Sequence, residues 1–422
     1  MWHHADFKKE EKMKDRVILH SDANCFYASC EMVLNPELQG KAVAVGGNEE
    51  ERHGIILAKS EKAKVAGVKT GMPLWEARNL CPDLIIIPPH FKEYSKFSKL
   101  LHEIYERYTD YIEPFGLDEC WLDVTDCGVD GEEIAQEIRK TVKSELGLTV
   151  SVGVSFNKVF AKLGSDLKKP DAVTVISREN FKEKIWPLPA SDLLYCGRQT
   201  SKALSEYGVH TIGSLASLPL DFIVRKFGKN GHSLWNFANG LDDSRVAHKN
   251  YYEPPKSVGH GVTCVENLES DDEACKVILT LSLDIGYKLR KEGLYASGVS
   301  LSIKDEFFTH YSYQARLNAS TQDESVISKE AIKLLKTNYP WVFKIRALTV
   351  TAIGIETNDT PIQQSMFFDY EKEDKRKKLG AVIDDIKDTY GKGAILPGAV
   401  LDEKKMPKRR PEESVLPGQM HK

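Results

Sequence analysis

Asp118 and Glu119 stand side by side in the apolar run PFGLDECWLDVT, which spans residues 114–125. In a regular β-strand neighbouring side chains point to opposite faces of the sheet, so the two carboxylates can serve one site only where the strand gives way to a turn. Gly116 before the pair and the apolar residues after it predict a strand–turn–strand hairpin. Two carboxylates brought together repel each other, and one is driven to take up a proton unless a cation lies between them. The pair therefore predicts a further partner in the chain and a bound metal ion.

Asp22 can supply a third carboxylate. It follows the apolar segment from Val17 to His20, which predicts a strand that ends at Asp22 and turns into a helix. If this strand neighbours the hairpin, the three carboxylates meet over one edge of a sheet. Such a set suits a pair of Mg²⁺ ions, because two metals about 3.5–4 Å apart can hold both oxygens of an in-line phosphoryl displacement. Spacing alone leaves an alternative equally open, in which Asp22 caps the helix and the pair forms a solvated turn.

Composition sets the broad class of the protein. The chain has 422 residues, 41% of them hydrophobic, enough for several domains with cores of their own. No run approaches the roughly 18 apolar residues of a membrane helix, and residues 1–14 predict an irregular leader or an upstream start ahead of Met13 rather than a secretory signal. The eight cysteines lack metal-ligand spacing and predict reduced thiols in a cytoplasmic protein. A net charge of −4 does not indicate nucleic-acid binding, although a basic groove can lie within an acidic average.

Hydrophobic periodicity divides the rest of the chain. The first 180 residues predict an α/β unit in which helices mix with antiparallel hairpins. Short helices broken by glycines follow from 187 to about 240, and then a Pro- and Tyr-rich linker, HKNYYEPPKS. Residues 258–357 predict a compact α+β module. A further helix is expected near EDKRKKLGAVIDDIKDTYG, and the polar tail 401–422 is expected to be disordered.

Three motifs carry a resemblance to a known family: SDANCFYAS, GLDECWLDVT and the long SVGVSFNKVFAKLGSDLKKPDAVTVI, in this order. They resemble the Y-family translesion DNA polymerases, and among these the bacterial DNA polymerase IV branch. KTGMPLWEA matches the fingers segment of the family, and the resemblance covers roughly residues 15–370. It implies a template-directed, error-prone DNA polymerase that adds dNTPs to a primer 3′ end by two-metal phosphoryl transfer.

The resemblance also implies a mixed α+β multidomain fold, a right hand with palm, small fingers, a helical thumb and an α+β little finger. The expected segments are a leader (1–14), the palm (15–30 and 90–178), the fingers (31–89), the thumb (179–245), a linker (246–257), the little finger (258–357) and a clamp-binding motif with the C-terminal tail (358–422).

Site residues follow from the same motifs, position by position. The resemblance implies that the metal ligands, for two Mg²⁺ ions, are the carboxylates of Asp22, Asp118 and Glu119 and the backbone carbonyl of Ala23. It places the incoming nucleotide against four side chains: Phe26, Tyr27, Lys64 and Lys169. Tyr27 takes the place of the steric gate, whose ring leaves no room for a ribose 2′-hydroxyl, and Lys169 that of a lysine that neutralises the triphosphate. The alternatives are a core aromatic and a solvated helix end.

The chain departs from the family pattern in the fingers and beside the hairpin. Lys64 stands where arginine is usual, and Glu61 stands where a tyrosine touches the phosphates. Lysine is a point charge rather than a bidentate fork, so a weaker or differently arranged grip on the triphosphate is expected. Gly116 stands where serine is common, which removes a hydroxyl beside Asp118.

DNA contacts are expected in two places. The segment LLYCGRQTSKALSEYGVHTIGSLA resembles the family's helix-hairpin-helix, in which backbone N–H groups near Gly197 meet DNA phosphates at little cost in net charge. Tyr195 takes a place where glycine is usual, so a distorted hairpin is expected. In the module that resembles the little finger, four side chains on neighbouring strands are expected to face the duplex: Lys304, Tyr311, Tyr313 and Arg316. Ordinary polar strand faces are an equally weighted alternative.

The string QQSMFF, Gln363 to Phe368, resembles the bacterial sliding-clamp-binding peptide, with Gln363, Met366 and Phe367 as the residues that fill the pocket. Packing back on the body of the protein is the alternative. The implied partners are thus primer–template DNA, dNTP and a sliding clamp, with the chain acting as a monomer and away from membranes.

Two other functions compete with a polymerase. A catalytically silent scaffold that binds DNA or a clamp would have no reason to keep Asp22, Asp118, Glu119 and Lys169. A palm-type nucleotidyl cyclase would explain the metal ligands but would leave the thumb hairpin and the little finger without a role.

Overall fold

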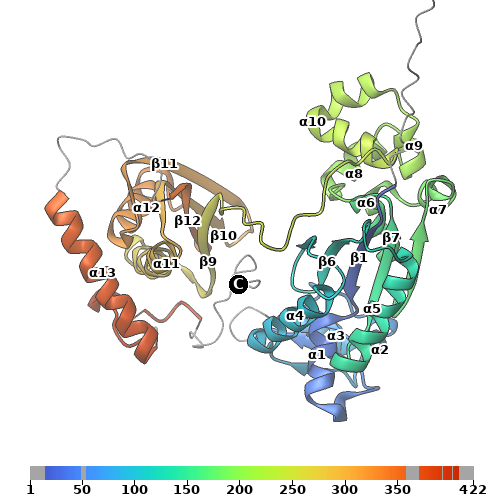
Figure 1. The fold of residues 1–422 in the computed structure, drawn as a ribbon. Coiled ribbons are helices and arrows are strands. Elements are labelled where there is room, and N and C mark those ends of the chain that lie inside the picture. Colours follow the sequence, from blue (N-terminus) through green and yellow to red (C-terminus); the bar gives the residue numbers. More distant parts are fainter. Residues whose placement is uncertain (1–14, 49–53, 358–369, 392, 402, 408–422) are drawn as a thin grey trace, which may run out of the picture. The chain divides into compact units, whose positions relative to one another are not determined.

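The computed structural model describes residues 15–48, 54–357, 370–391, 393–401 and 403–407, and its contacts divide the chain into two units (Figure 1). The first unit contains residues up to Val45 and from Ile56 to Tyr251, and the second contains residues from Tyr252 to 407 together with Gly46–Ile55. None of the described helices is both long enough and apolar enough to cross a membrane.

A five-stranded sheet forms the centre of the first unit, in the order β5-β6-β1-β7-β8. Neighbouring strands are antiparallel except β7 and β8, which are parallel. The strands are β1 (Ile18–Ala23), β5 (Ile112–Pro114), β6 (Glu119–Asp123), β7 (Val150–Ser155) and β8 (Val173–Ile176). Every residue of β1 and β7 is buried, because helices cover both faces of the sheet.

The two faces of this sheet carry different helices. One face packs against α1 (Phe26–Leu34), α4 (Phe91–Tyr105) and α5 (Gly131–Leu146), and the other against α6 (Lys158–Leu167). In β1, Leu19 belongs to the core on the first face, whereas Ile18 packs with Ala161 of α6. Alternation along the strand therefore turns Asp22 toward the face that α6 covers.

Two glycines let α6 lie close to the sheet. A Cβ on Gly153 of β7 would lie 1.9 Å from the carbonyl oxygen of Ala161, and a Cβ on Gly164 of α6 would lie 3.0 Å from the Cα of Gly153. A side chain at either position would push the helix outward, together with the polar residues that it carries toward β1 and β6.

A smaller sheet in the order β3-β2-β4 packs against two short helices. Its elements are the 3₁₀ turn η1 (Pro36–Leu38), β2 (Val43–Gly46), β3 (Ile56–Lys59), α2 (Glu61–Val65), α3 (Leu74–Leu80) and β4 (Ile85–Ile87). Together with the central sheet, it forms the unit of helices and antiparallel hairpins predicted for the first 180 residues.

Short helices complete the first unit. They are α7 (Phe181–Ile185), the 3₁₀ turn η2 (Ala190–Asp192), α8 (Arg198–Ser205), α9 (Ile212–Ala216) and α10 (Leu220–Ala238). Their core includes Phe156 and Phe160, which join it to the central sheet and α6. Helix α10 is kinked at Gly228, whose φ of 59° and ψ of −144° are not helical. The prediction of short helices interrupted by glycine is confirmed.

The second unit is an antiparallel sheet in the order β11-β10-β12-β9 with two helices on one face. Its elements are β9 (Ser257–Leu268), α11 (Asp271–Lys291), β10 (Leu294–Asp305), β11 (His310–Thr321), α12 (Glu324–Asn338) and β12 (Ile345–Thr357). The predicted α+β module is confirmed. Side chains on the face opposite the helices are mostly small or polar.

The chain beyond β12 packs back onto this module. Helix α13 (Tyr370–Tyr390) and the 3₁₀ turn η3 (Gly398–Val400) contact α11. Arg290 of α11 binds Asp384 of α13 through hydrogen bonds of 2.6 and 2.9 Å, and binds Glu324 at 2.6 Å. Its side chain is only 13% exposed, so each of these charges depends on the others for its solvation.

The expectation of a disordered tail is wrong for residues 403–407. The Val265 N–H donates to the Lys405 carbonyl oxygen at 2.8 Å, which extends the edge of the sheet beyond β9. The Lys405 ammonium lies 2.7 Å from Glu273, and Met406 packs against the core. Backbone pairing with a sheet edge is invisible in composition, which is why a polar sequence suggested disorder.

Candidate active site

Asp22 and Glu119 lie opposite each other on adjacent strands. The register of β1 and β6 pairs these two residues, and the Ala23 N–H donates to the Asp118 carbonyl oxygen at 2.9 Å. Asp118 ends the turn between β5 and β6, and Glu119 begins β6. The predicted hairpin is confirmed, and so is the expectation that the strand of Asp22 neighbours it. Three carboxylates thus lie close enough to influence one another's charge at one edge of the sheet.

The carboxylates of Asp22 and Asp118 are disfavoured as anions at this edge. Burial, together with the charges of Asp22 and Glu119, raises the pKa of Asp118 to about 6. Burial also raises the pKa of Asp22, which is 7% exposed, although Lys169 acts in the opposite direction. Carboxylates that repel one another in a buried place are stabilised by a cation between them. Their oxygens are the donors that a hard divalent cation such as Mg²⁺ prefers, so the residues fit that group.

Lysines from α6 and from the segment after it bind two of the carboxylates. Lys169 donates to Asp22 Oδ2 at 2.6 Å, and Lys162 donates to Glu119 Oε2. Burial alone would raise the pKa of Glu119, but hydrogen bonds from His20 and Lys162 lower it to about 2. Within the described part of the chain, no three His, Cys, Asp or Glu side chains are arranged to hold a metal ion. The structure brings the predicted ligands together without directing them at one point.

Sequence analysis missed the residues that hold Glu119. His20 is fully buried, with Nδ1 2.8 Å from Ser165 Oγ and Nε2 3.3 Å from Glu119 Oε2. Ser165 in turn donates to the Lys162 carbonyl oxygen at 2.7 Å. The sequence did contain one signal for a charged helix face near the carboxylates. Lys162 and Asp166 lie one turn apart on the same face of α6, shortly before Lys169.

The ring of Tyr27 is held by two other aromatics. It stacks on Tyr94 with 4.3 Å between centroids and 13° between planes, and it meets Phe91 edge-on at 6.0 Å. Tyr27 is half-buried. Phe26 is 3% exposed and packs in the core, which leaves its side chain little surface to offer a nucleotide. Roles for both residues in nucleotide binding stay predictions.

Lys64 and Glu61 pair with each other on α2. Their charged atoms lie 3.5 Å apart, and the Lys64 side chain is half exposed. Glu61 also accepts a hydrogen bond from Cys25 Sγ at 3.2 Å, which links α2 to the start of α1. A carboxylate so close to Lys64 reduces the positive charge available for a triphosphate, in line with the weaker grip expected from the sequence.

The thumb hairpin places Gly197 as the residue before α8 and Tyr195 in the loop. Tyr195 has φ of 66°, a left-handed conformation that favours glycine, and its side chain is 62% exposed. The backbone therefore has the left-handed conformation that a glycine would adopt, although a tyrosine stands there.

Replacement of Tyr195 by glycine is expected to stabilise this hairpin by about 1 kcal/mol, because it removes the clash of a Cβ in the left-handed region. Hydrogen exchange of the amides in η2, α8 and α9 would measure the change. Faster exchange in Tyr195→Gly would contradict the prediction, and it would show that the contact of the ring with Phe237, 6.2 Å between centroids, outweighs the strain.

The four predicted DNA contacts of the second unit do not share one face. Lys304 pairs with His310 across β10 and β11, and Gly298 pairs with Arg316, on the face away from the helices. Tyr311 pairs with Ile303 and Tyr313 pairs with Leu301, and these four pack with the core on the helix-covered side. The two-residue repeat of a strand corrects the expectation that all four side chains face the duplex together, and a DNA role for Tyr311 and Tyr313 stays a prediction. Gln363, Met366 and Phe367 of the predicted clamp motif lie outside the described residues.

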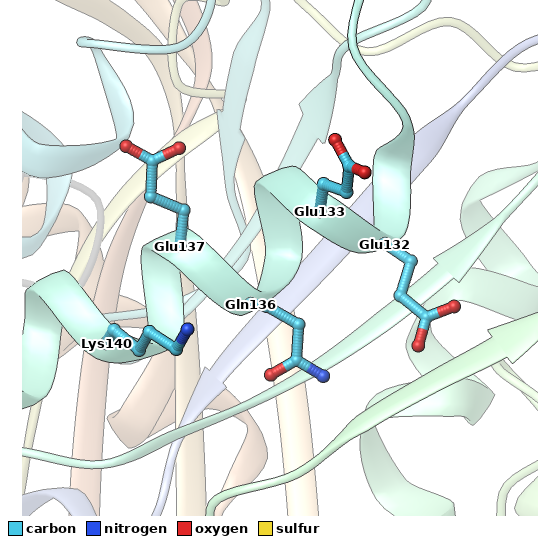
Figure 2. Close-up of a pocket in the computed structure, with 5 residues that line it drawn as sticks. All are labelled: Glu132, Glu133, Gln136, Glu137 and Lys140. Carbon is cyan, nitrogen blue, oxygen red and sulfur yellow. The ribbon is translucent and has the colours of Figure 1, made fainter.

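An open pocket lies along α5, lined by Glu132, Glu133, Gln136, Glu137 and Lys140 (Figure 2). None of the predicted site residues lines it. Its three glutamates disfavour a polyanionic substrate. The candidate for catalysis is therefore the sheet edge and not this pocket.

Comparison with known proteins agrees with this geometry. A solved chimeric Y-family DNA polymerase has the same fold, with a TM-score of 0.72 and 23% sequence identity over 81% of this chain and 100% of that one. Residues 21–166 match the impB/mucB/samB family, and residues 255–366 match its C-terminal domain. The chain thus has the fold of a right-hand polymerase.

Relatives narrow the class further. DNA polymerase IV of Acetivibrio thermocellus is 46% identical over 92% of this chain and 98% of its own length. DNA polymerase IV of Bacillus anthracis is 37% identical over 92% and 94% of the two chains, and that of Clostridium acetobutylicum is 33% identical over 92% and 99%. The chain belongs to the Y-family DNA polymerases, in the DNA polymerase IV branch.

Proposed function

We propose that this translesion DNA polymerase extends a primer at the sheet edge formed by Asp22, Asp118 and Glu119, with two Mg²⁺ ions held by these carboxylates and by the Ala23 carbonyl. The observation that carries the proposal is the register of β1 and β6, which sets Asp22 opposite Glu119 and beside Asp118. Divalent metal chemistry is general in the family, whereas the identity and number of the ions are part of the proposal.

In the reaction, the primer 3′-hydroxyl oxygen forms a bond to the α-phosphorus of a dNTP. The bond from that phosphorus to the bridging oxygen breaks, pyrophosphate leaves with the electron pair, and the hydroxyl proton is released. Ions held by Asp22, Asp118 and Glu119 would lower the pKa of the hydroxyl and would stabilise the charge of the leaving group. Positioning and electrostatics provide most of the rate enhancement in such transfers.

The remaining side chains have positioning roles in the proposal. Without a nucleotide, Lys169 binds Asp22. When the nucleotide enters, Lys169 neutralises its triphosphate, and Lys64, which is paired with Glu61, acts as a weaker second cation. Lys162 and His20 fix the Glu119 carboxylate. The ring of Tyr27, held by Tyr94, lies under the sugar and excludes a 2′-hydroxyl.

DNA is proposed to contact the loop at Gly197 and the sheet face that carries Lys304 and Arg316. The other side chains of this face are mostly small or polar, and Lys304 and Arg316 add positive charge to it. Local cations of this kind would let the chain bind DNA although its net charge is −4. One chain supplies every proposed ligand, so we propose that the enzyme acts as a monomer. We also propose a cytoplasmic location, in keeping with the eight cysteines expected to be reduced.

Primer extension with Mg²⁺ on undamaged and lesion-bearing templates tests the whole proposal. Addition of templated dNTPs past a lesion supports it. DNA binding without extension would favour the silent scaffold, and cyclisation of a nucleotide without a primer would favour the cyclase; the relatives favour neither.

Deletion of residues 363–368 is expected to abolish stimulation by a sliding clamp and to leave distributive synthesis unchanged, because tethering raises effective concentration without changing the chemistry. Processivity with and without the clamp measures this. A scrambled sequence of the same six residues is the control for chain length. Clamp stimulation that survives the deletion would show that the clamp binds elsewhere.

A further inference from the structure

One end of the sheet in the second unit carries exposed apolar side chains on two adjacent loops. Phe307 and Phe308, between β10 and β11, are 67% and 59% exposed. Val342 and Phe343, just before β12, are 69% and 39% exposed. We call Phe307, Phe308, Val342 and Phe343 the aromatic tip. Large apolar side chains gathered on a surface usually mark a binding site.

The aromatic tip is built on a rigid base. Asp305 is fully buried, and its Oδ1 accepts the N–H groups of Phe307 at 2.9 Å and Thr309 at 2.8 Å. The two loops are joined twice, because the Glu306 N–H donates to the Lys344 carbonyl oxygen at 3.0 Å and the Lys344 N–H donates to Glu306 Oε1 at 3.0 Å. Hydrogen bonds therefore fix the backbone that carries the exposed rings.

Backbone strain points in the same direction. Phe308 has φ of 67°, a left-handed conformation that bulky residues rarely adopt because it is strained. Phe307 meets Phe343 edge-on with 5.1 Å between centroids, so the two loops present their rings together. The strained backbone at Phe308 thus coincides with an exposed aromatic ring. Strain of this kind often lies at functional sites.

Cations beside the rings identify the chemistry of the occupant. The Lys304 ammonium lies 5.5 Å, and the Arg346 guanidinium 4.8 Å, from the ring centroid of Phe308. Nearby carboxylates are engaged: Glu306 with the Lys344 backbone and Glu269 with the Lys344 ammonium at 2.6 Å. Exposed rings next to cations are the recognition chemistry of single-stranded nucleic acid, whose bases stack while its phosphates meet positive charge.

We propose that the aromatic tip is a stacking platform for unpaired bases of the template strand, with Lys304 and Arg346 meeting the adjacent phosphates. This inference rests on the proposed function only in taking the template as the source of the single strand. It concerns a surface of the second unit alone, and it uses none of the residues placed in the catalytic centre. Lys304 lies on the sheet face already proposed for DNA, so the platform would continue that face.

The test compares two DNAs with the full chain carrying Phe307→Ala and Phe308→Asn. Asparagine tolerates a left-handed φ, so the double variant keeps the loop conformation and relieves its strain. Fluorescence anisotropy measures the affinity for a primer–template with an unpaired 5′ template overhang and for the same duplex with blunt ends. We expect about a tenfold or greater loss on the overhang DNA, from stacking energies of about 1–3 kcal/mol per base, and no change on the blunt duplex.

Matched controls lie on α13, where Leu379 and Val382 are 60% and 55% exposed. Leu379→Ala and Val382→Ala should leave both affinities unchanged. Lys304→Gln should weaken overhang binding and reduce its salt dependence, whereas the aromatic substitutions should leave the salt slope unchanged.

Three results would overturn the proposal. Equal loss on overhang and blunt DNA, in a double variant that still extends a primer at saturating DNA, would place the tip on duplex. Unchanged affinity for both would exclude a DNA platform. If the wild type sediments as a dimer and the double variant sediments as a monomer, the tip is a self-association surface. Failure of the proposed polymerase function is separately visible, because neither wild type nor variant would then extend a primer at saturating DNA, whereas the binding comparison can still be read.

Discussion

Asp118→Asn is expected to lower single-turnover primer extension by at least about a thousandfold while DNA affinity stays within about twofold of wild type. The Asp118 carboxylate is one of three that share one sheet edge, and burial together with its neighbours raises its pKa to about 6. An amide keeps the shape but removes the charge that a divalent cation needs. Glu119→Gln should behave in the same way, since it removes the carboxylate opposite Asp22.

Asp123→Asn is the matched control, because Asp123 ends the same strand and its Oδ1 accepts the Thr125 N–H at 3.0 Å, a bond that an amide oxygen can keep. This variant should retain near wild-type extension. Rapid-quench extension and anisotropy on the same primer–template measure both quantities. Residual activity of Asp118→Asn above roughly a tenth of wild type would be too much for the loss of a metal ligand and would refute the assignment.

Local chemistry made the meeting of carboxylates at one sheet edge predictable from sequence. Adjacent carboxylates cannot share a site within a strand, so Asp118 and Glu119 required a turn, and Gly116 supplied one with φ of 133°. Asp22 followed as the partner, because it ends an apolar strand. The two-residue repeat and charge repulsion predicted the turn and the need for a partner, but the choice of a ligand role over a helix cap for Asp22 came from the family resemblance.

Contacts that depend on packing were not predictable in the same way. Lys162 reaches Glu119, and Ser165 reaches His20, only because α6 lies close to β7 across Gly153 and Gly164, a distance that no local pattern encodes. The tail at Lys405 pairs with a sheet edge whose exposure depends on strand order. The error over Tyr311 was avoidable, because its number differs from that of Arg316 by an odd count, and a regular strand puts such residues on opposite faces.

Tyr27→Ala is expected to reduce discrimination between dNTP and rNTP by at least about a hundredfold, because a steric clash worth a few kcal/mol is removed. The structure supports a rigid obstacle. The ring stacks on Tyr94 at 4.3 Å and meets Phe91 edge-on at 6.0 Å. A ring held on two sides cannot turn away from a 2′-hydroxyl. The ratio of the kcat/KM values for a dNTP and its matching rNTP measures the effect.

Two further variants separate the gate from core packing. Tyr27→Phe keeps the ring and should keep the discrimination. Tyr94→Leu removes the stacking partner, whose hydroxyl is fixed by Glu31, and should give an intermediate ratio because the Tyr27 ring is then free to tilt. A structural role alone predicts the opposite order, since Tyr94 is fully buried and its loss should damage the fold more than the loss of half-buried Tyr27. If Tyr27→Ala leaves the ratio unchanged while Tyr94→Leu lowers both rates, Tyr27 is a packing residue, and the selection against ribose must come from another part of the nucleotide site.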